Sequence, residues 1–253
     1  MRKHTLVLLC LAVVLVFASA VMAGVNPGTG IQYTSHDLSM TTGKGATWAP
    51  NSDYSTTGAG LDRICIYCHA PHHTLKSADA VAAGINYFPL WNHALSTITS
   101  YTPYSNGTEV PGSIQHQLNA TIGQPGSVSK LCLSCHDGSV AVGAYGYAPS
   151  SSIGTTNVKA SDRILIGDLG NLQNHHPIGF DYGAVQAVDD EIKDPTSVLL
   201  GNNPDLLSIN DLLWGGKMEC SSCHDVHNTK NTGMKFLWVE DTSSNLCFSC
   251  HDK

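Results

Sequence analysis

Five residues with the spacing Cys-x-x-Cys-His occur four times in this chain of 253 residues. Two thiols on one tight turn can each form a thioether with a vinyl group of the same porphyrin, and the histidine that follows then faces the iron. This pattern is the sequence signature of covalent haem c attachment. It predicts eight attachment residues, namely Cys65, Cys68, Cys132, Cys135, Cys220, Cys223, Cys247 and Cys250.

Each motif also supplies one axial iron ligand, and these proximal ligands are His69, His136, His224 and His251. Disulfide bonds and zinc account less well for the paired cysteines. A disulfide framework suits an exported chain, and a zinc site suits Cys-x-x-Cys pairs. Neither requires a histidine after the second cysteine in every copy, so we expect four covalently bound haems c.

The second axial ligand decides what each iron can do, because histidine or methionine closes the iron for electron transfer and an open position admits substrate. Beyond residue 23 and outside the motifs lie His36, His72, His73, His93, His116, His175, His176 and His227. The methionines have no recurrent placement near the motifs. We therefore expect bis-histidine irons of low potential and no enzymatic activity.

A repeated spacing selects two of these histidines. His72 lies three residues after His69, and His227 lies three residues after His224. Such a histidine cannot reach the far side of its own porphyrin, but it projects toward a neighbouring one. The sequence therefore predicts that His72 and His227 are distal ligands that connect paired haems.

The other two distal ligands are expected to be His36 and His176. His36 precedes Asp37, which could orient its ring, and His176 precedes Pro177, which fixes the backbone. His93 remains an alternative to His36, and His175 an alternative to His176. His73 and His116 receive no role.

The first residues describe a cleaved secretory signal peptide, 1–23. Arg2 and Lys3 precede an apolar run from Leu6 to Phe17, and small residues end at Ala23. The run is too short to span a bilayer comfortably, and nothing later replaces it, so we expect no integral membrane span. Removal of the peptide leaves 11 basic and 20 acidic residues, a net charge of −9 that argues against nucleic acid as a partner.

Charged residues make up only 13% and aromatic residues 7% of the chain, so the polypeptide alone is poorly equipped to build a large core. We expect a multihaem cytochrome c fold, mostly irregular coil with a few short helices and minimal strand, wrapped around a stack of four haems. One domain, 24–253, would comprise an N-terminal arm (24–60), a first haem pair (about 61–150), a connecting segment (151–214) and a second haem pair (about 215–253).

Four local elements follow from patterns outside the motifs. Residues 77–84 are rich in alanine and end in glycine, which predicts a short helix. Pro204 after Asn203 predicts the first turn of a helix over 205–214. Residues 163–166 and 234–240 are expected to be short strands.

Several segments together resemble the doubled Cys-x-x-Cys-His multihaem cytochromes of metal-reducing bacteria. They are Cys-x-x-Cys-His-Ala-Pro-His, Leu-Cys-Leu-Ser-Cys-His-Asp-Gly, Ser-His-Asp-Leu-Ser, Leu-Trp-Asn and His-Pro-Ile-Gly. The resemblance covers the chain after the signal peptide. It implies an outer-surface tetrahaem cytochrome that polymerises head-to-tail into an extracellular conducting filament, exchanging electrons with other cytochromes or extracellular acceptors. It also implies that one axial histidine crosses between subunits, for which His36 is the favoured residue.

Two alternative functions stay open. A diffusible periplasmic tetrahaem shuttle has the same chemistry without polymerisation. A multihaem reductase of a nitrogen or sulfur oxyanion requires an open iron, and the surplus of histidines argues against one.

Overall fold

The computed structural model describes residues 30–32, 34–38, 64–72, 74–104, 122–145, 164–230 and 236–252. The predicted signal peptide lies outside these residues, as do most of the predicted arm, His73 and His116. Within the described ranges, no helix combines the length and the apolar character that a membrane crossing needs.

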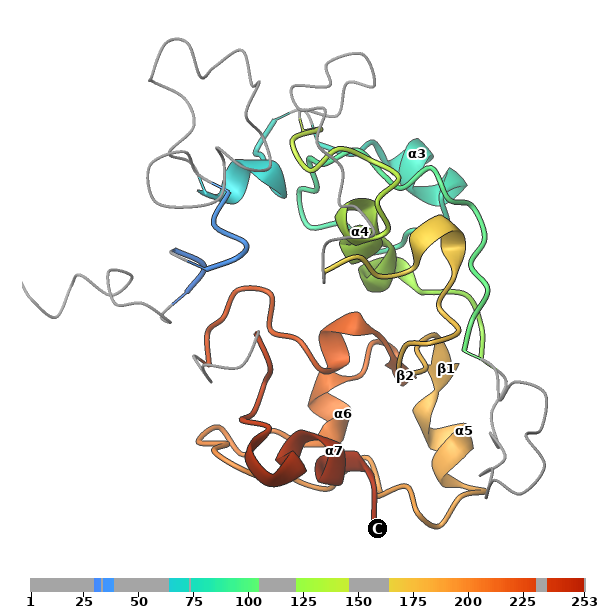
Figure 1. The fold of residues 1–253 in the computed structure, drawn as a ribbon, viewed down its shortest axis with the longest axis vertical. Coiled ribbons are helices and arrows are strands. Elements are labelled where there is room, and N and C mark those ends of the chain that lie inside the picture. Colours follow the sequence, from blue (N-terminus) through green and yellow to red (C-terminus); the bar gives the residue numbers. More distant parts are fainter. Residues whose placement is uncertain are drawn as a thin grey trace, which may run out of the picture.

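Short helices joined by irregular segments make up the described chain, as the sequence predicted (Figure 1). The helices are α3 (Ser77–Ala82), α4 (Ser127–His136), α5 (Tyr182–Gln186), α6 (Ile209–Leu212) and α7 (Asn245–Cys250). Single 3-10 turns are η2 (Ile64–Tyr67), η3 (Asp168–Gly170), η4 (Cys220–Ser222) and η5 (Thr242–Ser244). Strands β1 (Phe180–Asp181) and β2 (Lys217–Met218) pair antiparallel, with Phe180 opposite Met218.

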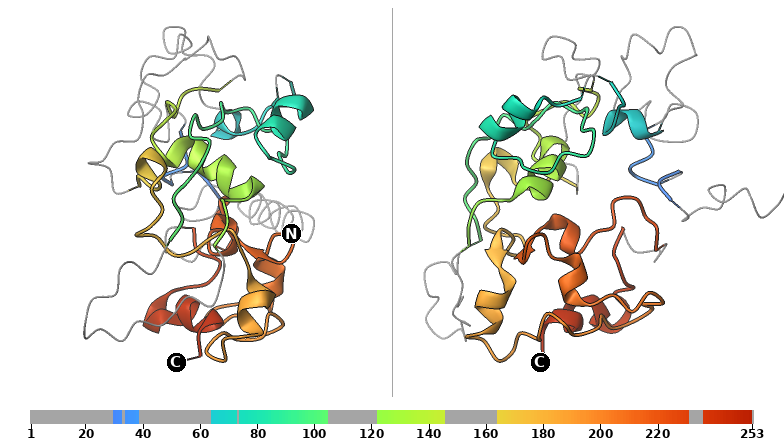
Figure 2. Two further views of the ribbon diagram at one scale, coloured as in Figure 1. Left: turned by 90° about the vertical axis from the view of Figure 1, so that its right-hand side faces the viewer. Right: turned by 180° about the vertical axis from the view of Figure 1, so that it is seen from behind.

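The elements fall into two halves that meet near the β1–β2 pair. The upper half in Figure 1 contains α3 and α4, and the lower half contains α5, α6 and α7; the turned views of Figure 2 show the same division. Helix α4 reaches the lower half through hydrogen bonds to Glu219 and Cys220. Haem motifs two and three therefore lie at the junction of the halves.

Apolar side chains form several small clusters. The largest, in the lower half, contains Phe180, Tyr182, Val185, Leu199, Ile209, Leu212, Met218 and Val239. A second surrounds Trp91 and Leu131, and a third joins Tyr101, Leu133 and Leu172. Cysteines of the motifs pack against these clusters, for example Cys68 and Cys250. The division agrees with the expectation that the polypeptide alone supplies no large core.

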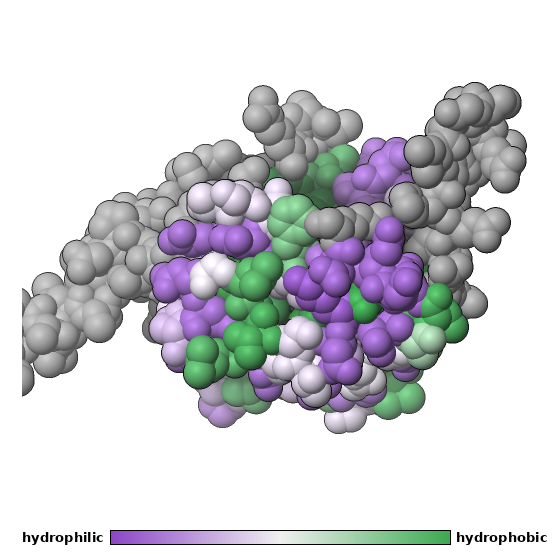
Figure 3. All heavy atoms as spheres, turned by 90° about the horizontal axis from the view of Figure 1, so that it is seen from below, coloured by the Kyte–Doolittle hydropathy of each residue, from purple (hydrophilic) through white to green (hydrophobic). Residues whose placement is uncertain are grey.

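The surface of the lower half is mixed in character. Viewed from below, it shows hydrophobic groups set among hydrophilic ones (Figure 3). Large apolar side chains exposed in this half include Val188 at 63% and Leu206 at 73%. Scattered exposure of this kind is ordinary for a folded protein.

The four local predictions had different outcomes. Helix α3 confirms the one over 77–84, and Gly84 follows it with a φ of +66°. The helix over 205–214 is wrong at its start, because the Asn203 amide bonds both the N–H and the carbonyl of Leu207 and folds 203–207 into a turn. Helix α6 begins only at Ile209, after a capping box of Ser208 and Asp211. In their described parts, residues 164–166 and 236–240 form no strand.

Candidate functional site: the four Cys-x-x-Cys-His motifs

All four motifs lie on single helical turns. Motif two ends α4, and motif four covers the end of α7. Motif one occupies η2, where the His69 N–H donates to the carbonyl of Cys65 at 2.8 Å, and motif three occupies η4, where the His224 N–H donates to Cys220 at 3.2 Å. Residues three and four apart on a turn share one face. Each turn therefore presents two thiols and an imidazole together.

The eight cysteines are free thiols in the structure. Burial raises the pKa of Cys68, Cys135 and Cys223 to about 12 in each case.

Three proximal histidines each face a histidine from a distant part of the chain. The ring centroids of His69 and His227 are 6.1 Å apart, and those of His136 and His36 are 6.0 Å apart. The ring centroids of His251 and His176 are 6.4 Å apart. The pairs join residues that are 158, 100 and 75 positions apart in sequence.

This separation would fit two imidazoles that hold one metal ion between them. A metal–imidazole bond is about 2 Å long and the ring centre lies about 1 Å behind the nitrogen, so two axial rings hold their centroids about 6 Å apart. Among the described residues no three histidine, cysteine or acidic side chains form a metal-binding group. Pairs of imidazoles suit a metal whose remaining ligands come from a porphyrin.

Backbone carbonyls orient three of these rings. Nδ1 of His69 lies 2.5 Å from the carbonyl oxygen of Pro89, and Nδ1 of His136 lies 2.8 Å from that of Ile164. Nδ1 of His176 lies 3.0 Å from the carbonyl of Pro177. A carbonyl accepts only from a protonated nitrogen, so Nδ1 carries the hydrogen and Nε2 is left for a metal.

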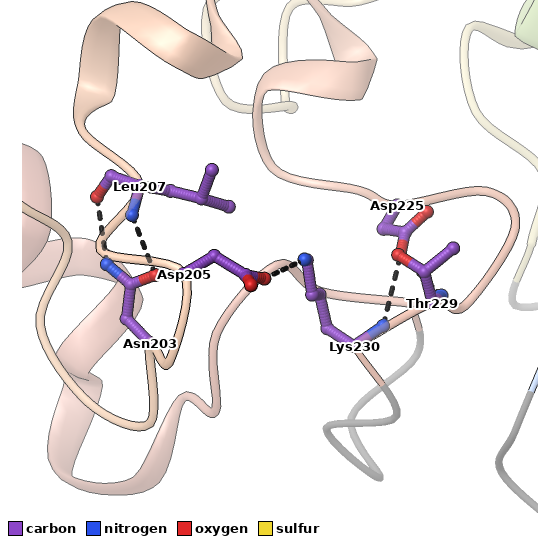
Figure 4. A network of polar contacts seen from close by, with 6 residues as sticks. All are labelled: Asn203, Asp205, Leu207, Asp225, Thr229 and Lys230. Carbon is purple, nitrogen blue, oxygen red and sulfur yellow. Dashed lines mark hydrogen bonds and ion pairs between the residues drawn. The ribbon is translucent and has the colours of Figure 1, made fainter.

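The loop that carries His227 is built around one carboxylate. Asp225, 4% exposed, accepts hydrogen bonds from the backbone N–H groups of His227, Thr229 and Lys230. The Lys230 ammonium in turn pairs with Asp205, next to the Asn203 turn (Figure 4). Asp225 therefore fixes the backbone from which the His227 ring reaches His69.

We expect Asp225→Ala to lower the free energy of unfolding by about 1–3 kcal/mol, because it leaves buried N–H groups without an acceptor. Chemical denaturation followed by circular dichroism measures the change. Lys230→Ala is the control, since Asp205 is 53% exposed and the pair is worth about 0–1 kcal/mol. Equal losses in the two variants would contradict a special role for Asp225.

His36 packs between two other parts of the chain, at Phe236 and His136. Its ring stacks on Phe236, with centroids 4.6 Å apart and an interplanar angle of 16°. Gly30 and Asn228 hold the same segment through two hydrogen bonds, of 3.3 and 3.0 Å. Burial, with a smaller effect of His136, lowers the pKa of His36 to about 4. At neutral pH the ring is neutral, the form that binds a metal.

The remaining predicted histidines have different surroundings. His72 is exposed, and no ring of the described residues packs against it. His175 is half-buried and uses its backbone N–H to bond Leu172. His93 is 1% exposed, with Nδ1 2.7 Å from the carbonyl of Ala94 and Nε2 3.1 Å from that of Ala141. Nε2 of His93 also lies 3.4 Å from Sγ of Cys135, so His93 adjoins an attachment cysteine of motif two. His73 and His116 lie outside the described residues.

Two buried polar atoms next to the motifs test whether haem fits here. Nε1 of Trp91 and Oγ of Ser221 find no hydrogen-bond partner within the described part of the chain. Trp91 packs edge-on against the His69 ring, with centroids 6.1 Å apart, and Ser221 lies within motif three. Buried donors normally have partners, and the propionates of a haem are acceptors of the right kind. The residues present therefore fit haem.

Sequence reasoning missed several supporting residues. Phe236, Trp91 and Glu219 carry no motif, and only their folded contacts reveal them. An aspartate follows directly after motifs two, three and four, and this repetition could have pointed to Asp137 and Asp225 as supporting residues. Asp137 is 2% exposed and accepts from the Tyr101 hydroxyl at 2.6 Å.

Comparison with known families gives one match. The doubled CXXCH motif family matches residues 215–253, which contain motifs three and four. The comparisons with curated proteins and with solved structures give no match. Together with the repeated motifs, the family match supports a multihaem c-type cytochrome with covalently bound haem c, which acts in electron transfer with redox partners.

Proposed function

We propose that this chain is a tetrahaem electron conductor in which histidine closes both axial positions of every iron. The observation that carries the proposal is the set of three histidine pairs at 6.0, 6.1 and 6.4 Å between centroids. His69 with His227, His136 with His36 and His251 with His176 would each hold one iron. His224 holds the last, for which His72 is the distal candidate.

When bound, haem supplies an iron that gains and loses one electron. The polypeptide orients the histidine rings through backbone carbonyls, closes the iron to water and substrate, and holds neighbouring haems together. His227 contributes most to holding the haems together, because its loop begins at motif three and its ring faces the ligand of motif one. Irons with both axial positions occupied by histidine suit electron transfer, whereas an oxyanion reductase would need an open position on one iron.

Mass spectrometry and electron paramagnetic resonance of the purified haem-loaded protein test the proposal. We expect a mass of the mature chain plus four haems and only low-spin ferric signals. A high-spin signal from one iron would favour the reductase. A mass with fewer haems would refute the tetrahaem assignment.

We further propose that the protein is exported and assembles into a head-to-tail extracellular filament. The support is the resemblance to the filament-forming cytochromes and the way His36 is held. The described residues of this segment, 30–32 and 34–38, contact the rest of the chain at Asn228, Phe236 and the Val226 backbone, and Leu38 packs against the cluster of Tyr67 and Tyr145. The same segment of a neighbour could occupy the same pocket, and such an exchange, repeated without closing, builds an open filament.

Electron microscopy of the purified protein separates the filament from the diffusible shuttle. Filaments at micromolar concentration support the first function. A uniform monomer that stays low-spin on dilution would favour the shuttle, because it would place His36 against His136 of its own chain.

A further inference from the structure

A buried carboxylate at the junction of motifs two and three has no role in holding iron. Glu219 is 3% exposed and directly precedes Cys220. Both of its oxygens lie 3.1 Å from the backbone N–H of Gly126, the N-cap of α4. It also accepts a short hydrogen bond from the Ser129 hydroxyl. Bonds from backbone N–H groups at a helix N-terminus to a carboxylate are charge-assisted and strong.

Ser129 completes the connection between the two motifs. Its hydroxyl donates to Glu219 and accepts from the backbone N–H of Cys220 at 2.9 Å. Ser129 lies three residues before Cys132, so the two side chains share one face of α4. The bonds thereby place an attachment cysteine of motif two beside one of motif three. The Cys132 and Cys220 side chains lie close enough to interact directly.

The other side of the contact leaves no room for a side chain. A Cβ added to Gly126 would overlap Oε1 of Glu219. An alanine at 126 would therefore push the Glu219 carboxylate away from the backbone N–H that it accepts from. The Glu219 backbone is fixed as well, because its N–H donates to the Ser222 hydroxyl at 2.9 Å.

We propose that Glu219 is a positioning residue that sets the spacing between the haems of motifs two and three, and so their rate of electron exchange. The inference rests on the proposed function, because it assumes that both motifs carry haem. Glu219 is neither an attachment cysteine nor a proximal histidine. It acts by clamping the start of α4 to η4, at the place where the two halves of the chain meet (Figure 1).

The test compares haem-loaded Glu219→Ala with wild type by three measurements. Mass spectrometry counts haems, electron paramagnetic resonance reports the spin state, and circular dichroism in the Soret band reports the coupling between neighbouring haems. We expect unchanged haem content and low-spin irons, but a loss of Soret coupling amplitude and slower intramolecular electron exchange after flash reduction. Gly126→Ala disturbs the same contact from the opposite side and should give the same change.

Asp194→Ala is the matched control. Its carboxylate also accepts from a backbone N–H and a hydroxyl, but both belong to Thr196, so no distant segments are joined. The control should keep the wild-type Soret spectrum. Wild-type coupling and exchange rate in either Glu219→Ala or Gly126→Ala would overturn the inference, including where the other variant fails to fold. A wild-type protein without haem on motifs two and three would instead refute the proposed function.

Discussion

Replacing His227 with alanine is expected to turn one haem from six-coordinate low-spin into five-coordinate high-spin, while the others stay low-spin. The reason is geometric: the His227 ring is the partner that faces His69, at 6.1 Å between centroids. Without it the iron held by His69 has an open position, which changes the spin state and admits small ligands. Electron paramagnetic resonance of the oxidised protein and carbon monoxide titration of the reduced protein measure the change.

His175→Ala is the matched control for this prediction. His175 adjoins the predicted ligand His176, but its hydrogen bond comes from its backbone N–H, so the substitution keeps that bond. The control should bind no carbon monoxide and stay fully low-spin. A fully low-spin His227→Ala protein would show that some other group closes the iron of His69.

Replacing His36 with alanine is expected to open the iron held by His136 and to abolish filaments, while haem attachment stays complete. His36 is the histidine whose ring lies 6.0 Å from that of His136, and it belongs to the segment that the filament proposal exchanges between subunits. Covalent attachment depends on Cys132 and Cys135, which the substitution leaves intact. Mass spectrometry, electron paramagnetic resonance and electron microscopy of one preparation measure haem content, spin state and assembly.

Phe236→Leu controls for a general loss of packing around the His36 ring. It removes the ring that stacks on His36 at 4.6 Å but keeps the imidazole, so we expect low-spin irons and intact filaments. Normal filaments from His36→Ala would refute a crossing role for His36. An unchanged low-spin spectrum would refute its role as an iron ligand.

Dilution of the wild-type protein separates the two placements of His36. If His36 binds within its own chain, dissociated monomers stay low-spin. If it comes from a neighbour, dissociation opens one iron in each monomer until the chain's own residues 30–38 return to His136, so a transient high-spin signal follows dissociation. Spin state measured across the dissociation range therefore decides which chain supplies the ligand.

The distal ligands show how much of the haem ligation the sequence spacing alone predicts. The three-residue offset predicts that His227 serves a haem other than that of its own motif, but it gives no partner. The predicted haem pairs followed sequence order, whereas the structure brings motif three's His227 to motif one's His69. His93 was an alternative by sequence, and only folding shows that its Nε2 lies 3.4 Å from Sγ of Cys135 in motif two.

The sequence by itself determined the chemistry that lies within a few adjacent residues. Attachment cysteines, proximal histidines and a coil-rich fold follow from composition and from one helical turn, because turn geometry depends little on the rest of the chain. The tertiary structure decided which histidines meet, how Asp225 and Glu219 hold the segments around them, and where α6 begins. Those choices depend on contacts between residues as far apart as 69 and 227, and local patterns carry no information about such distances.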